Sequence, residues 1–203
     1  MSDAANPIPR IERPDPCPFH VMMEGSSVPL SRLDAFDVEN YLERFRGHLY
    51  RAAQEHMGGM PPGVLFASIH GAYDPNTRTY PLHIHGIVTE GKIALIDALR
   101  PLPMYQPAVA GDNRDAARTP ILMPRQPVKS LASAIGYALK AYWPMRPTFL
   151  APDGLRTAFD VPVMRIREEP ACSEYLRFLD KWAIKQTTLI MGMRASDCGL
   201  VRL

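Results

Sequence analysis

The sequence predicts an α+β fold in which an antiparallel sheet carries helices packed on one face. Two neighbouring segments, 63–72 and 80–89, alternate apolar and polar residues across a turn, as the strands of a hairpin do. Three other segments carry apolar residues at the spacings of three and four that amphipathic helices require. The resulting order, β-α-β-β-α-β-α, favours two layers, a sheet and helices on one side of it, followed by a C-terminal helical extension.

Periodicity and helix-breaking residues define the individual elements. Asp37 can cap a helix over 38–56, and the Gly and Pro pairs within 58–62 end it. Prolines within 120–127 favour an edge strand there, because proline cannot donate to a sheet. The other expected elements are a strand at 19–24, strands at 63–72 and 80–89 joined by a turn at 73–77, a short helix at 92–99, a loop at 101–118, a helix at 131–143, a hairpin within 149–165 and a helix at 173–185.

Composition limits the class of protein. The chain has 203 residues, of which 46% are hydrophobic, enough for one sizeable core. A net charge of +2 neither requires nor excludes a nucleic-acid partner. Three widely spaced cysteines argue against a disulfide scaffold and suit a reducing cytosol. With no signal-peptide pattern or long apolar run, we expect a cytoplasmic protein with a proline-rich tail (1–17), a main domain (18–147) and an extension packing on it (148–203).

The segment YPLHIHGIV places two histidines inside an expected strand. Alternate residues share a face, so His83 and His85 point one way while Leu82 and Ile84 point towards the core. The preceding strand has His70 on its non-core face by the same alternation. Joining the two apolar faces predicts a register in which Ser68 faces His83 and His70 is its diagonal neighbour, provided that the turn has the assumed length.

Three imidazoles are therefore expected on the non-core face of the hairpin. Neutral imidazoles bind divalent metals, which makes His83, His85 and His70 candidate ligands. Glu24 or His20 on the first strand could supply the third ligand instead of His70. The alternative is that these histidines are ordinary half-exposed residues of a sheet.

A helix with a tyrosine follows downstream. Tyr137 and Lys140 are three residues apart and share a helical face. A different stripe is apolar and is expected to dock on the sheet; its members are Leu131, Ile135, Leu139 and Tyr142. A nearby cation or a metal-polarised electrophile can make a phenol an effective nucleophile. The alternative is a partly buried tyrosine beside a surface lysine.

The histidine strand followed by Tyr137-x-x-Lys140 resembles the HUH endonucleases, especially the single-tyrosine rolling-circle replication initiators. The resemblance covers roughly residues 18–146 and includes the order of elements, with the tyrosine downstream of the histidines. It implies an HUH/Rep-like fold with a ferredoxin/RRM-like core, in which Mg²⁺ or Mn²⁺ on His83 and His85 polarises a phosphate of single-stranded DNA or a DNA hairpin.

The same resemblance implies the roles of further residues. Tyr137 would form a 5′-phosphotyrosine link and release a 3′-OH, and Lys140 would position the phosphate. A separate host helicase is an expected partner, since the sequence has no phosphate loop of the GxxxxGK[ST] type. Candidate DNA-backbone contacts are Arg114, Arg118, Arg125 and Lys129.

Two other functions remain open on the sequence, and a third lacks a necessary ligand. An HUH-like module that binds DNA or protein without cleaving it would share the fold and the histidines. A single-strand DNA transposase would share the chemistry. A cupin-like metal protein would share His83-x-His85 followed by Glu90, but all six histidines lie at or before residue 85, so no later histidine completes a cupin site.

Overall fold

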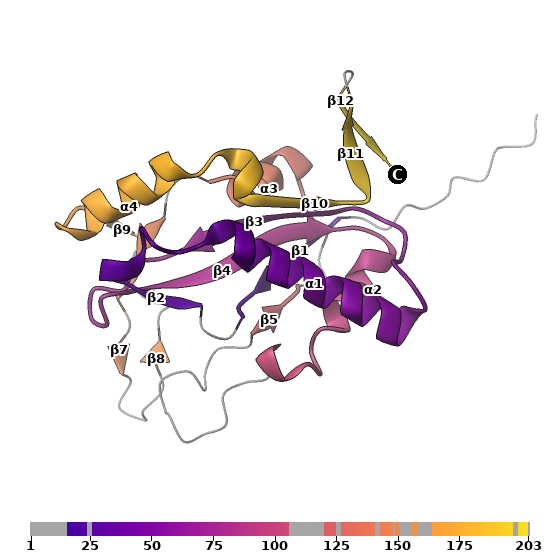
Figure 1. Ribbon diagram of the computed structural model, residues 1–203, viewed down its shortest axis with the longest axis horizontal. Coiled ribbons are helices and arrows are strands. Elements are labelled where there is room, and N and C mark those ends of the chain that lie inside the picture. The colour runs from indigo at the N-terminus through magenta and orange to yellow at the C-terminus, as the bar shows by residue number, and fades with distance from the viewer. Residues whose placement is uncertain are drawn as a thin grey trace, which may run out of the picture.

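The computed structural model places most of the chain in a sheet flanked by helices (Figure 1). The described residues are 16–23, 26–105, 120–124, 127–140, 143–147, 149–150, 156–157, 164–196 and 199–202.

The central strand of the sheet is β4 (Thr79–Val88). It pairs with β3 (Leu65–Gly71) on one side and with β1 (Cys17–Val21) on the other, antiparallel in both cases. The predicted α+β class with an antiparallel sheet is therefore confirmed. The remaining strands of the sheet are β10 (Thr188–Met191) beside β3, β5 (Ile121–Leu122) beside β1 and β2 (Ser27–Pro29) beside the start of β4.

The long helix α1 (Val38–Met57) covers the apolar face of the sheet and lies on the viewer's side of it in Figure 1. The Asp37 side chain accepts a hydrogen bond of 3.0 Å from the backbone N–H of Asn40 and caps the helix. Gly58, with a φ of 68°, ends it. On the inner side, the Phe45 ring stacks on Phe19 of β1 with ring centroids 6.4 Å apart. The core therefore lies between α1 and one face of the sheet.

Shorter elements complete the described chain. The other helices are α2 (Gly91–Asp97), α3 (Leu131–Ala138) and α4 (Ala171–Lys181), with 3-10 turns η1 (Leu30–Arg32), η2 (Pro103–Tyr105) and η3 (Ile184–Gln186). Three two-stranded sheets pair β6 (Pro144–Met145) with β9 (Met164–Arg165), β7 (Phe149–Leu150) with β8 (Arg156–Thr157), and β11 (Met193–Ser196) with β12 (Gly199–Arg202).

The C-terminal part of the chain is built into the main sheet. Its strand β10, which the sequence did not predict, pairs with β3. Two buried hydrogen bonds help to attach helix α4: the Tyr80 hydroxyl donates to the Ala171 carbonyl at 2.9 Å, and the Trp143 backbone N–H donates to the Tyr175 hydroxyl at 2.8 Å. The region after residue 148 is therefore more than a helical extension, because it supplies an edge strand.

Helix α3 differs from its prediction in three respects. It ends at Ala138 rather than at 143, and it contacts the face of the sheet opposite to α1, so the helices do not all lie on one face. The expected docking stripe does not dock, since Leu131 and Leu139 are 50% and 38% exposed. The face that α3 meets carries histidines, which offer no apolar surface for a stripe of leucines. Tyr142 lies outside the described residues.

The register of the β3–β4 hairpin also differs from the prediction. His70 lies directly opposite His83, and Ser68 opposite His85, a shift of two residues. The cause is the turn, which closes at an Asp74–Thr79 bridge and leaves the four residues 75–78 in the loop. The Asp74 carboxylate accepts from the Asn76 N–H at 3.0 Å and supports this turn. Because the shift is even, every residue keeps its predicted face.

No helix among the described residues is both long enough and apolar enough to cross a membrane.

Gly86, which follows the second histidine of β4, is required by packing. A Cβ at this position would lie 2.4 Å from two atoms of the Phe19 ring and 2.4 Å from the Phe66 carbonyl oxygen. The absence of a side chain at Gly86 therefore lets the Phe19 ring pack closely against β4.

We predict that Gly86→Ala destabilises the protein by about 1–3 kcal/mol, the usual effect of overpacking a core. Gly47 is the matched control: it lies within α1 and nothing would contact its Cβ within 4 Å. Gly47→Ala should stabilise by about 0.5–1 kcal/mol, because alanine favours a helix interior. Urea unfolding measures both changes, and equal stabilities of the two variants would contradict the packing argument.

Candidate metal centre

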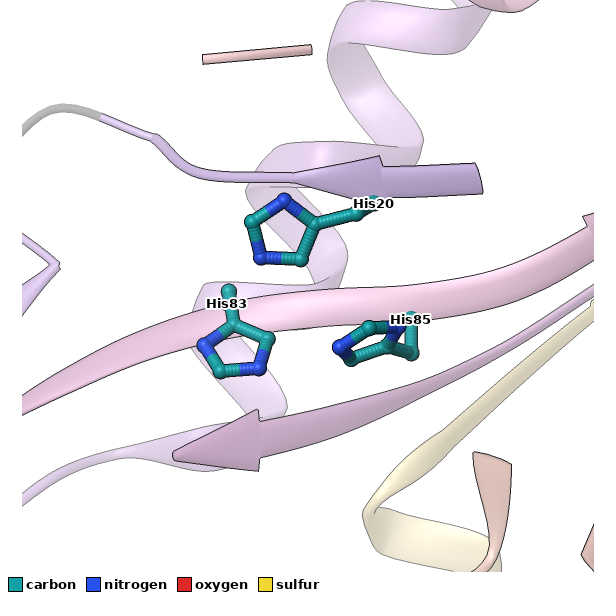
Figure 2. A group of neighbouring side chains, drawn as sticks. All are labelled: His20, His83 and His85. Carbon is teal, nitrogen blue, oxygen red and sulfur yellow. The ribbon is translucent and has the colours of Figure 1, made fainter. Parts of the chain in front are cut away.

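Three histidines from two adjacent strands form a compact group, His20 from β1 and His83 and His85 from β4 (Figure 2). Their ring centroids lie 4.6 Å (His20–His83), 4.9 Å (His20–His85) and 4.8 Å (His83–His85) apart. One nitrogen from each ring lies within 4.8 Å of the other two. Figure 2 shows the His20 ring directed towards the two rings of β4.

The strand pairing brings His20 into this group. In β1, Phe19 and Val21 are buried in the core, so the residue between them faces the opposite side of the sheet. The antiparallel register places His20 directly opposite His85. The sequence left His20 as one alternative for the third ligand. The pairing of β1 with β4 is what brings it beside His83 and His85.

His70, the expected third ligand, lies beside this group, and its ring is hydrogen-bonded to the backbone of α3. Its ring centroid is 4.8 Å from that of His85 and 6.0 Å from that of His83. Its Nε2 lies 2.9 Å from the Ala138 carbonyl oxygen. Since a carbonyl only accepts, Nε2 carries the hydrogen and donates it. That nitrogen is therefore occupied by the carbonyl, and the three nitrogens that lie within 4.8 Å of one another come from His20, His83 and His85.

Of the predicted residues Glu24, Arg114, Arg118, Arg125 and Lys129, the structure describes only Lys129. Lys129 is exposed and directly precedes the cap of α3. The other four lie outside the described part of the chain.

Tyr137 lies next to the histidines. Its ring centroid is 5.2 Å from that of His85, edge to face, and 5.6 Å from that of His70. The side chain is 51% exposed, so it is accessible to a large substrate. The Lys140 Nζ lies 5.8 Å from the centre of the Tyr137 ring. Tyr137 therefore lies beside His85 of β4, and Lys140 lies beside Tyr137.

Burial keeps the histidines in the form that binds metals. Desolvation, together with repulsion from the neighbouring imidazoles, lowers the pKa of His83 well below its usual value and that of His85 to about 3. Burial also lowers the pKa of His70. The His83 Nδ1 lies 3.3 Å from the Pro81 carbonyl oxygen, to which it can donate, which directs the lone pair of Nε2 away from the backbone.

The donor set fits a divalent transition metal. Two imidazole nitrogens on one ion at about 2.1 Å each lie no more than about 4.2 Å apart, so modest side-chain rotations would bring this group to bonding distance. Imidazole nitrogens suit transition metals, whereas Mg²⁺ prefers oxygen ligands. Of the two ions expected from the sequence, Mn²⁺ is therefore the better match.

No protein-family model matches the chain, and no curated protein or solved structure matches it significantly. The geometry of the site is therefore the basis for assigning a function.

We predict that acid destabilises the metal-free protein. Histidines held neutral in the folded state take up protons near pH 6.5 once the chain unfolds, so stability is fully present above that pH and is lost as the pH falls towards the lowered folded pKa values. Each such histidine adds a slope of up to about 1.4 kcal/mol per pH unit below pH 6.5. Urea unfolding at pH 7.5, 6.5 and 5.5 measures this. His85→Gln should reduce the slope, and an unchanged slope would contradict the assignment.

We also predict that the protein binds one Mn²⁺ through His20, His83 and His85. Titration calorimetry should show His20→Ala and His85→Ala each weakening Mn²⁺ binding at least about tenfold, since each removes a ligand. Mg²⁺ should bind more weakly than Mn²⁺ to the unchanged protein. His56→Ala, an exposed position on α1, is the control. Retention of full Mn²⁺ affinity by His20→Ala would exclude this ligand set.

Proposed function

We propose that this protein is a metal-dependent enzyme that nicks and joins single-stranded DNA through a 5′-phosphotyrosine intermediate, as HUH endonucleases do. The observation that carries the proposal is the approach of the exposed Tyr137 to the histidine group, with ring centroids of Tyr137 and His85 5.2 Å apart. Three imidazoles that could hold a divalent ion, with an exposed phenol beside them, suit metal-assisted phosphoryl transfer to tyrosine.

The reaction needs no external energy source. The Tyr137 oxygen would form a bond to the scissile phosphorus, while the bond from phosphorus to the 3′ oxygen breaks. The phenol loses its proton and the departing 3′ oxygen gains one, so the step is balanced. One phosphodiester replaces another, and a later 3′-OH can reverse the reaction and join the strand.

The residues around the tyrosine suit a phosphate substrate. When bound, the divalent ion would supply Lewis-acid polarisation of the phosphate and charge neutralisation. Positive charge from Lys140 acts on His70, and positive charge from Arg146 acts on His85, so both cations lie near the histidine group. Together with the exposed Lys129, they favour a nucleic-acid backbone over a neutral substrate.

The fold is compatible with this proposal. An HUH/Rep-like domain of the ferredoxin/RRM-like kind has an antiparallel sheet with one face packed against a helix and the other available to nucleic acid. Here α1 covers the apolar face, while the opposite face carries the histidines.

We predict that Mn²⁺ and single-stranded oligonucleotides yield a covalent protein–DNA adduct that withstands denaturing gel electrophoresis. Tyr137→Phe should abolish the adduct, because it removes the oxygen that bonds to phosphorus. Tyr50→Phe is the matched control, since Tyr50 on α1 is exposed to the same extent, 50%. An adduct that persists in Tyr137→Phe would refute the assignment of the nucleophile.

The same assay separates the other HUH-like functions. Binding of Mn²⁺ and DNA with no adduct on a library of oligonucleotides would indicate a module that binds without cleaving. Cleavage restricted to oligonucleotides carrying a hairpin beside the nick, followed by joining to a second strand, would favour a single-strand transposase over a replication initiator.

A further inference from the structure

The helix that carries Tyr137 is held on the sheet by very little packing. Ala138 is the only buried residue among the eight of α3. The neighbouring residues include Leu131, Tyr137 and Leu139, all large and all exposed. Apolar burial therefore contributes little to the position of this helix, and some other contact must fix where the tyrosine lies.

That contact is at the C-terminal end of α3. The carbonyls of the last helical turn have no partners further along a helix and need other donors. The Leu139 N–H donates to the Ile135 carbonyl at 2.8 Å, and the Lys140 N–H to the Tyr137 carbonyl at 3.2 Å. The carbonyl of Ala138, the last residue of the helix, accepts from His70 Nε2 at 2.9 Å.

His70 is well suited to hold this end of the helix. It lies on β3, an interior strand of the sheet paired with β4 and β10, and it is only 5% exposed. Its ring also packs against the Tyr137 ring, at a centroid distance of 5.6 Å and an interplanar angle of 35°. One side chain on a rigid strand thus contacts both the ring of Tyr137 and the carbonyl of the next residue.

We propose that His70 is a positioning residue that fixes the last turn of α3, and with it the Tyr137 phenol, relative to the histidine group. This role rests on the proposed function for its effect on DNA, but the anchoring of α3 is a property of the fold alone. It distinguishes His70 from His20, His83 and His85, which form the candidate ligand group.

Two substitutions separate anchoring from other roles of His70. In His70→Gln the side-chain amide nitrogen reaches about as far as imidazole Nε2 and can donate to the Ala138 carbonyl. In His70→Asn the amide is one carbon shorter and cannot reach it. Both variants replace the imidazole with a polar amide, so they differ mainly in whether the hydrogen bond to the Ala138 carbonyl can form.

Hydrogen exchange tests the anchoring directly. The amides of Leu139 and Lys140 should exchange at least about tenfold faster in His70→Asn and close to normally in His70→Gln, because only the longer amide keeps the anchor. Peptides from α1 should be unchanged in both variants, which verifies that the core is folded. Unchanged exchange at the end of α3 in His70→Asn would overturn the proposal.

Single-turnover cleavage tests the consequence for Tyr137. His70→Asn should slow adduct formation by about ten- to a hundredfold, the size expected for a misplaced reacting group, while DNA affinity and Mn²⁺ affinity stay within about threefold. His70→Gln should recover most of the rate. Loss of Mn²⁺ binding in both variants would instead identify His70 as a ligand and overturn the proposal.

The hydrogen-exchange and cleavage experiments test the anchoring role and the proposed function independently. If the unchanged protein forms no adduct but His70→Asn loosens the end of α3, the proposed function fails and the anchoring role stands. If the protein forms the adduct and His70→Asn alters neither exchange nor rate, the proposed function stands and the positioning role fails.

Discussion

The pairing of β4 with a neighbour on each side is the constraint on which the rest of the structure depends. The register with β3 sets His83 against His70, and the register with β1 sets His85 against His20. Burial of the apolar face excludes a slip of one residue in either pairing, because such a slip would bring the histidines into the core. Gly86 permits the close contact with Phe19 that holds β1 in place. The histidine group is thus a consequence of core packing on the other face of the same strands.

Most of this sheet could be predicted from the sequence, because the pattern that marks each strand lies within the strand itself. Alternation of apolar residues assigns a face to each residue of β3 and β4 without any knowledge of the partner strand. Alternation does not fix the register beyond parity, since registers that differ by two residues satisfy it equally. The choice between them lies in the 75–78 loop, where the Asp74 side chain and a left-handed Arg78, with a φ of 53°, set the turn. The predicted register was therefore wrong while the predicted faces were right.

The other features that the sequence could not predict depend on long-range contacts. The position of β1 beside β4 decides that His20 joins the histidine group, and nothing within the segment 17–21 indicates its neighbour. Helix α3 has an apolar stripe typical of a core helix, yet the sheet face that it meets is lined by histidines. Its end is held by a hydrogen bond between residues 68 positions apart. Strand β10 is likewise recruited to β3 from more than a hundred residues away.

The two parts of the site differ in how firmly the fold holds them, and this difference suits the proposed chemistry. The candidate ligands extend from paired strands backed by the core, so their nitrogens have little freedom. Their desolvation in the neutral form reduces stability in acid, a cost that proteins commonly accept at functional sites. The tyrosine instead extends from a short helix with one buried residue. In the proposed reaction the phenol becomes attached to a strand end and later releases it to another 3′-OH, so it must stay close to the phosphate through two opposite displacements. A rigid ligand group would hold the phosphate in place, and a helix anchored at its end by His70 but otherwise lightly packed would keep the phenol beside it while allowing the small movements that the two displacements require.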